Sequence, residues 1–184
     1  MKKLVARAPA WAFFLYLLSL VSPDAAAGQL LPLGPPEYVS ASTGTFEIRK
    51  ELDEYEAGWE LRFAARRFWP LPDWAPDLIP VMGAMATSQG TLYGYGGFRV
   101  ETLFGERWVG SGGWATGLYY RGTGQGKDLG NVLEFRTHLE LAYRLPGESR
   151  LGLCLYHLSN GGIHHLNPGS ESLVLTYSAR LRRK

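Results

Sequence analysis

Cysteine is nearly absent from this 184-residue chain, which has only Cys154. A single cysteine cannot form an intramolecular disulfide, and it supplies neither a zinc-binding nor a redox motif. The neighbouring residues His164 and His165 lack acidic or cysteine partners at metal-ligand spacing. The sequence therefore predicts no metal and no other cofactor.

Long hydrophobic runs are also scarce. The longest lies at 11–21, after a charged opening and before three alanines at 25–27. This is the pattern of an export signal, and the run is shorter than a membrane-spanning helix usually needs. The alternative is an N-terminal anchor. We expect 1–27 to be removed and 28–184 to form one domain.

The expected mature part has no excess of one charge. The chain has 19 Lys and Arg residues against 17 Asp and Glu residues, and the export segment holds three of the basic and one of the acidic ones. Sixteen of each remain. This balance gives no reason to expect binding to nucleic acid.

Helical periodicity is missing as well, and alternation with period two takes its place over 54–66 and 132–145. In the second segment, apolar residues occupy one face and polar or charged residues the other. These two sets are Leu133, Phe135, Leu139, Leu141, Tyr143 and Leu145, against Glu134, Arg136, His138, Glu140 and Arg144. A soluble β-sandwich would also alternate, but its strands are typically about five or six residues long.

Strands of ten or more residues are typical of a transmembrane β-barrel, which meets lipid with one face and a polar interior with the other. The fold class we expect is all-β: an eight-stranded antiparallel barrel of the outer membrane. Its interior should be filled by side chains, with Glu and Arg residues paired, His138 in their network and Cys154 pointing inward. The expected strands are 37–49, 55–67, 78–87, 92–103, 107–121, 130–145, 149–159 and 172–183.

Strand number then orients the barrel. With a periplasmic N-terminus, the seventh strand ends at the outer surface, and 160–171 becomes the last extracellular loop. In this orientation, His157 and Ser159 lie with leucines on the lipid-facing side of the seventh strand. Glu171 lies with leucines on the lipid-facing side of the eighth strand. Polar side chains facing the membrane are costly unless they have a task.

A histidine, a serine and a carboxylate are the parts of a serine esterase. Residues two apart on a strand lie about 7 Å apart, which is close enough for His157 to take the Ser159 proton. Glu171 would then hold the imidazole and stabilise its protonated form. The local donors for an oxyanion hole are Asn160, Asn167 and the backbone amides near Gly161 and Gly162.

The stretch H-L-S-N-G-G-I-H-H-L-N-P-G-S-E-S at 157–172 resembles the signature of the PagL family of outer-membrane lipid A 3-O-deacylases. The resemblance implies a triad of Ser159, His157 and Glu171. It also implies that Asn160, Gly162 and Asn167 lie at the oxyanion or substrate site. It further implies an eight-stranded barrel in the bacterial outer membrane, crossing it many times.

The reaction implied by this resemblance is hydrolysis of the ester that joins an acyl chain to the 3-position of lipid A, the anchor of lipopolysaccharide. The expected partners are this substrate and the membrane lipids, and the sequence leaves a homodimer open. Two alternatives remain from the residues themselves. One is a structural or adhesion barrel without catalytic activity, and the other is a soluble, lipocalin-like barrel that binds a lipid inside.

Overall fold

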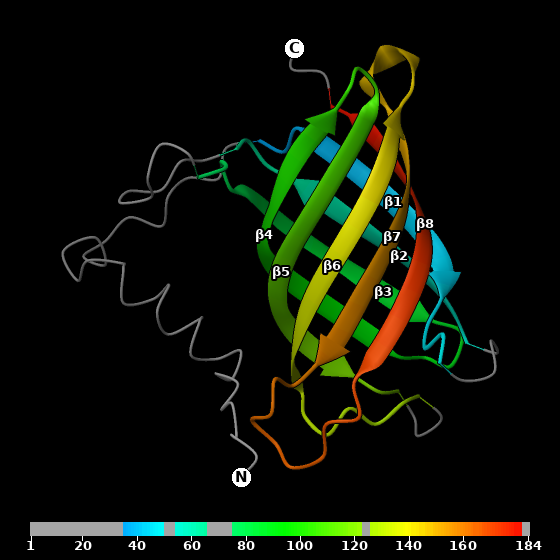
Figure 1. Ribbon diagram of the computed structural model, residues 1–184. Coiled ribbons are helices and arrows are strands. Elements are labelled where there is room, and N and C mark those ends of the chain that lie inside the picture. Colours follow the sequence, from blue (N-terminus) through cyan, green and yellow to red (C-terminus); the bar gives the residue numbers. More distant parts are fainter. Residues whose placement is uncertain (1–34, 50–53, 66–74, 123–125, 182–184) are drawn as a thin grey trace, which may run out of the picture.

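The chain forms a closed β-barrel of eight antiparallel strands (Figure 1), seen in a computed structural model that describes residues 35–49, 54–65, 75–122 and 126–181. The expected fold class is thereby confirmed. The expected export segment lies outside the described residues. The strands are β1 (Tyr38–Thr45), β2 (Tyr55–Arg62), β3 (Ile79–Thr87), β4 (Leu92–Phe104), β5 (Trp108–Tyr120), β6 (Leu133–Arg144), β7 (Arg150–Ser159) and β8 (Ser170–Arg180).

Each strand pairs with its neighbours in the sequence, and β1 pairs with β8 to close the barrel, in a register that runs from Tyr38 opposite Arg180 to Thr45 opposite Leu173. A short 3-10 turn, η2 (Pro146–Glu148), joins β6 to β7. Of the described residues, none belong to a helix long and apolar enough to span a membrane.

Several strand ends differ from the expected ones: β2 ends at Arg62 rather than 67, and β6 begins at Leu133 rather than 130. The two differences that bear on the site lie in β1 and β8. The sequence predicted a first strand to residue 49, but β1 ends at Thr45, and Glu47 adopts a left-handed conformation with φ of 64°. A left-handed residue cannot continue a strand, so the chain turns back there. The eighth strand begins at Ser170 rather than 172, which places Glu171 within the sheet.

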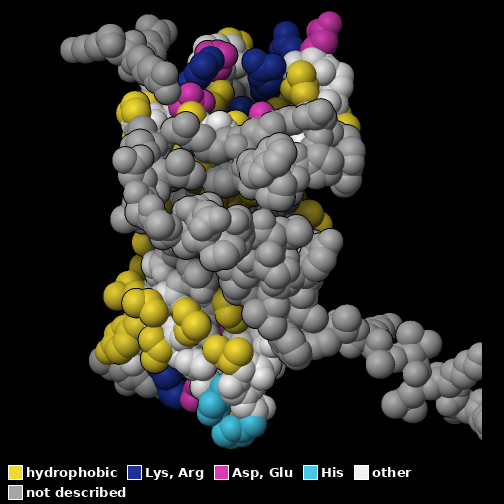
Figure 2. Space-filling view, turned by 90° about the vertical axis from the view of Figure 1, so that its left-hand side faces the viewer, with side chains coloured by type: hydrophobic (Ala, Val, Ile, Leu, Met, Phe, Trp, Pro, Cys, Tyr) yellow, Lys and Arg dark blue, Asp and Glu magenta, His cyan; other side chains and the backbone are white. Residues whose placement is uncertain are grey.

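The barrel is inverted relative to a soluble protein. Leu139 and Leu153 are 68% and 53% exposed on the outer face, whereas Glu134 and Glu60 are 0% and 7% exposed in the interior. Side chains alternate between the two faces of each strand, so the polar side chains of β6 point inward and its leucines point outward. In Figure 2, a group of hydrophobic side chains lies on the surface next to the end of the barrel that carries histidine side chains.

The interior is filled by paired charges, as the sequence predicted. Arg99 contacts Glu60 at 3.0 Å and also pairs with Glu140, and Arg62 reaches Glu140 at 3.4 Å. The space among these side chains is about 30 Å³, which is room for about one water molecule. His138 and Cys154 lie inside, again as expected. A charged, filled interior is the opposite of what a lipocalin-like lipid carrier requires.

Candidate active site on the outer face of the barrel

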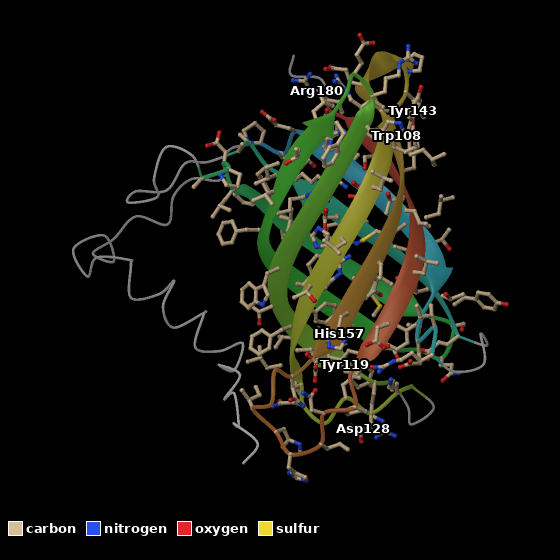
Figure 3. The ribbon with its side chains drawn as sticks, in the orientation of Figure 1. Trp108, Tyr119, Asp128, Tyr143, His157 and Arg180 are labelled. Atoms are coloured by element: carbon tan, nitrogen blue, oxygen red, sulfur yellow. The ribbon has the colours of Figure 1, made fainter. Side chains whose placement is uncertain are left out.

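The ends of β7 and β8 bring two of the candidate residues together. His157 lies directly opposite Glu171 in the antiparallel register. Their neighbours Leu158, Ser170 and Ser172 are fully buried. Because side chains alternate along a strand, His157 and Glu171 both point to the outside of the barrel. In Figure 3, His157 lies at the opposite end of the barrel from Trp108, Tyr143 and Arg180.

The imidazole and the carboxylate are in contact, with His157 Nδ1 at 2.9 Å from Glu171 Oε1. The two side chains are 41% and 24% exposed. An ionised carboxylate can only accept, so this contact places the proton on Nδ1. The opposite nitrogen, Nε2, then carries the lone pair that a general base needs.

Ser159 follows on the same outward face of β7, opposite Phe135 of β6. Its hydroxyl makes no hydrogen bond to His157 among the contacts of the described residues. The two residues are neighbours on one face, about 7 Å apart along the strand. A rotation of the two side chains is therefore needed to join them, and such contacts often tighten only with substrate bound.

Gly169 makes room for the imidazole. Its φ is +61°, and a Cβ placed there would lie 2.7 Å from His157 Cε1 and 3.4 Å from Nε2. A side chain at this position would push against the very edge of the ring that must face the serine. The sequence analysis did not single out this residue, because a glycine between proline and serine looks like ordinary turn chemistry.

Asn160, one of the candidate oxyanion residues, lies at the centre of a loop network instead of facing outward. It is fully buried, and its Nδ2 donates to the carbonyl oxygens of Leu129 at 3.0 Å and Leu166 at 2.8 Å. Its Oδ1 accepts from the Gly162 amide at 3.0 Å. The side chain thus ties the loop after β5 to the loop after β7.

The same network uses most of the expected oxyanion donors. The Asn160 backbone amide donates to Asn167 Oδ1 at 3.1 Å, and the Gly162 amide is already bonded to Asn160. Of the expected donors in the described residues, the Gly161 amide and Asn167 Nδ2 do not take part in this network. Which of them serves an oxyanion stays a prediction.

A chain of three charged side chains leads away from the second oxygen of Glu171, Oε2. Arg49 Nε pairs with Glu171 Oε2, Glu47 lies 3.6 Å from Arg49, and Lys127 pairs with Glu47. Burial lowers the pKa of Lys127, and the charge of Glu171 opposes this shift. The sequence analysis missed Arg49 at this site because it placed the residue at the end of the first strand, whereas β1 ends at Thr45 and Arg49 lies in the loop that follows.

An apolar groove of about 460 Å³ runs along the outer wall. Leu155 and Leu173, each two residues from a member of the His157–Glu171 pair, are among the residues that line it. The other outward-facing side chains that line it come from β4 to β7, and they include Val100, Phe104, Leu139, Leu141 and Leu153. Long apolar ligands fit such a surface.

In the described parts of the chain, no group of three or more His, Cys, Asp and Glu side chains is arranged to hold a metal ion. The lack of a cofactor stays a prediction from the sequence.

Comparison with known proteins gives a family match over most of the chain. Residues 53–180 match the family described as Lipid A 3-O-deacylase (PagL). A protein of Bordetella bronchiseptica named Lipid A deacylase PagL is 38% identical over 52 residues, which are 28% of this chain and 29% of that protein. The chain thus aligns with less than a third of that relative's length.

Two solved structures share the fold. One, titled as the crystal structure of the outer membrane enzyme PagL, superposes with a TM-score of 0.59 at 19% identity, covering 78% of this chain and 99% of the other. The second, from the de novo design of transmembrane β-barrels, has a TM-score of 0.51 at 9% identity and covers 79% and 95%. At these identities the matches support the barrel fold alone.

Proposed function

Because this chain belongs to the PagL family of lipid A 3-O-deacylases, we propose that it is an ester hydrolase that removes the 3-O-linked acyl chain of lipid A. Family and closed barrel together indicate a bacterial outer-membrane β-barrel protein. We further propose that Ser159, His157 and Glu171 perform the reaction on the lipid-facing exterior.

The contact of His157 Nδ1 with Glu171 Oε1 at 2.9 Å, on the outward face of the sheet, carries this proposal. A His–Glu pair could serve as a mere surface contact. Here it has a serine hydroxyl two residues along the same face and a glycine that clears the Nε2 edge. These are the relations between nucleophile, base and orienting carboxylate that a triad requires.

The reaction follows from these positions. Ser159 Oγ attacks the ester carbonyl carbon while His157 Nε2 takes the hydroxyl proton, and Glu171 stabilises the imidazolium that forms. The tetrahedral intermediate collapses as the proton passes to the departing sugar oxygen, which leaves an acyl group on Ser159. A water molecule, deprotonated by the same imidazole, then releases the fatty acid and restores the serine.

The oxyanion of this intermediate needs donors near Ser159. We assign this role to Asn167 Nδ2 and the Gly161 amide. The oxygen of the same side chain, Asn167 Oδ1, accepts a hydrogen bond from the backbone amide of Asn160, the residue after the serine. Asn160 and Gly162 support the site from within by holding the loop in shape. Removal of one such donor typically costs about 10²- to 10³-fold in rate.

The substrate can stay in the membrane during the reaction. Its acyl chain would lie in the apolar groove that begins at Leu155 and Leu173, and its ester would lie beside His157. The loops at this end of the barrel would then face the outer surface, where lipid A is found. The bilayer itself would deliver lipid A, and the homodimer left open by the sequence is not needed for this arrangement.

The test is the conversion of purified lipid A by the protein in detergent micelles, followed by mass spectrometry. The wild-type chain should release one 3-O-linked hydroxy-fatty acid, and Ser159→Ala should abolish this release while the barrel still folds. Ser149→Ala is the matched control, because Ser149 lies at the opposite end of the barrel and its hydroxyl donates to the Pro146 carbonyl, far from the proposed triad. Unchanged product from Ser159→Ala would favour a barrel without this catalytic triad.

A further inference from the structure

Arg49 joins the loop after β1 to the proposed catalytic carboxylate. Its Nε pairs with Glu171 Oε2, the oxygen that does not contact His157. Another nitrogen of the same guanidinium donates to the Pro168 carbonyl oxygen at 3.4 Å. A planar guanidinium can hold two acceptors at a fixed angle, so Arg49 links Glu171 to the loop that precedes it.

The loop that carries Arg49 is itself held in place. Glu47 is 5% exposed and adopts a left-handed conformation unusual for a residue with a side chain. Its carboxylate lies near Arg49 and pairs with Lys127 from the loop after β5. The backbone amide of Ile48 also donates to the Glu171 carbonyl at 2.8 Å. Backbone strain of this kind is found where surrounding contacts maintain it, often near functional sites.

We propose that Arg49 is a positioning residue that fixes the Glu171 carboxylate against His157, an inference that rests on the proposed function. A carboxylate on a strand end can rotate, and the imidazole contact alone restrains only one of its oxygens. Arg49 restrains the other. The residue lies before the segment 53–180 that matches the family, so the family match does not assign this role.

The experiment measures kcat and KM of full-length Arg49→Ala, with Arg49→Lys as the conservative variant. Misplacing a reacting group by about 1 Å costs about 100-fold in rate, so we expect kcat to fall by up to about that much with little change in KM. Lysine should restore part of the rate, because it keeps the charge but not the planar fork. The Ile48 amide contact does not depend on the side chain, so the loop should stay in place.

Arg121→Ala is the matched control. Its side chain is 44% exposed, against 55% for Arg49, and it pairs with Asp128 in the loop after β5. Removing it deletes a loop cation without touching Glu171, and kcat should stay near that of the wild type. The heat-dependent gel mobility of each variant shows whether its barrel has folded.

A double-mutant comparison decides the mechanism. If Arg49 acts through Glu171, Arg49→Ala should cost almost nothing further in a Glu171→Ala background. An equal loss in both backgrounds, with a raised KM, would mean that Arg49 binds an anionic group of the substrate and would overturn the proposal. Full activity of Arg49→Ala would overturn it too and leave the proposed function intact. A wild-type chain that releases no fatty acid would instead defeat the proposed function, and this inference with it.

Discussion

The two strand histidines, His138 on β6 and His157 on β7, occupy opposite faces of the same barrel wall. His138 is 5% exposed and lies beside Arg136, at 3.3 Å, in the charged interior. His157 faces outward against Glu171, with its second nitrogen turned to a glycine. The same residue type therefore contributes to packing in one place and is available for chemistry in the other, and the parity of the strand separates these roles.

The largest effect should come from replacing the outer histidine. His157→Asn should lower the deacylation rate by about 10⁶-fold, since removing the base of a Ser–His pair costs about as much as removing the whole triad. His138→Asn should leave the rate per folded molecule unchanged and lower the free energy of unfolding by about 1 kcal/mol. Rate assays and urea titrations of both variants measure this. Equal rate losses in the two would erase the distinction between the faces.

The two glutamates extend the comparison. Glu171→Gln should keep the barrel stable but reduce kcat by about 10⁴-fold, because an amide can leave the imidazole with its proton on the wrong nitrogen. Glu140→Gln, inside the barrel, leaves Arg99 and Arg62 without part of their counter-charge. We expect it to cost about 3 kcal/mol of unfolding free energy with a nearly normal kcat. The same urea titrations and assays apply, and a stable Glu140→Gln barrel would show that the interior charges are not coupled.

A smaller effect is expected at Gly169. Gly169→Ala should push the imidazole out of line and lower kcat by about 10²-fold, the usual cost of misplacing a reacting group by about 1 Å. Gly105→Ala is a control of matched backbone strain, with φ of +62° and nothing within 4 Å of the added Cβ. Activity assays on the two folded variants distinguish the clash of the new Cβ with His157 from the strain of placing alanine at a positive φ. Similar losses in both would implicate the backbone alone.

The smallest effect should come from the outer leucines. Leu155 lines the apolar groove, whereas Leu151, on the same face of β7 and equally exposed at 44% against 43%, does not. Leu155→Ala should weaken acyl-chain binding by about 1 kcal/mol, or roughly fivefold in kcat/KM. Leu151→Ala should change it little. Assays with lipid A in micelles measure both values, and a reversed order would move the acyl chain elsewhere on the wall.

Most of the fold could be predicted because parity is a local property. Along β6 and β7, alternate residues face lipid or interior, and the written order of Leu, Glu, Arg and His already separates the two sets. The same parity predicted that His157, Ser159 and Glu171 would share one side. The strand ends were less predictable: β1 stops at Thr45 because Glu47 turns the chain, and no residue type there announces a left-handed conformation.

The candidate site divides in the same way. Its triad residues were expected from the sequence, and their role stays a proposal that the variants above can test. The involvement of Asn160 in holding two loops together, the room that Gly169 leaves beside the ring, and the pairing of Arg49 with Glu171 were not foreseen. Each depends on loops that are distant along the chain.

The order of residues along each strand was enough to specify an inverted barrel with a polar interior, because alternation and strand length express the surroundings of each face directly. The order of residues along the strands does not reveal which side chains lie next to the Glu171 carboxylate. These neighbours depend on barrel closure, which brings β1 beside β8 and so carries the loop after β1 across more than a hundred residues of sequence to the site.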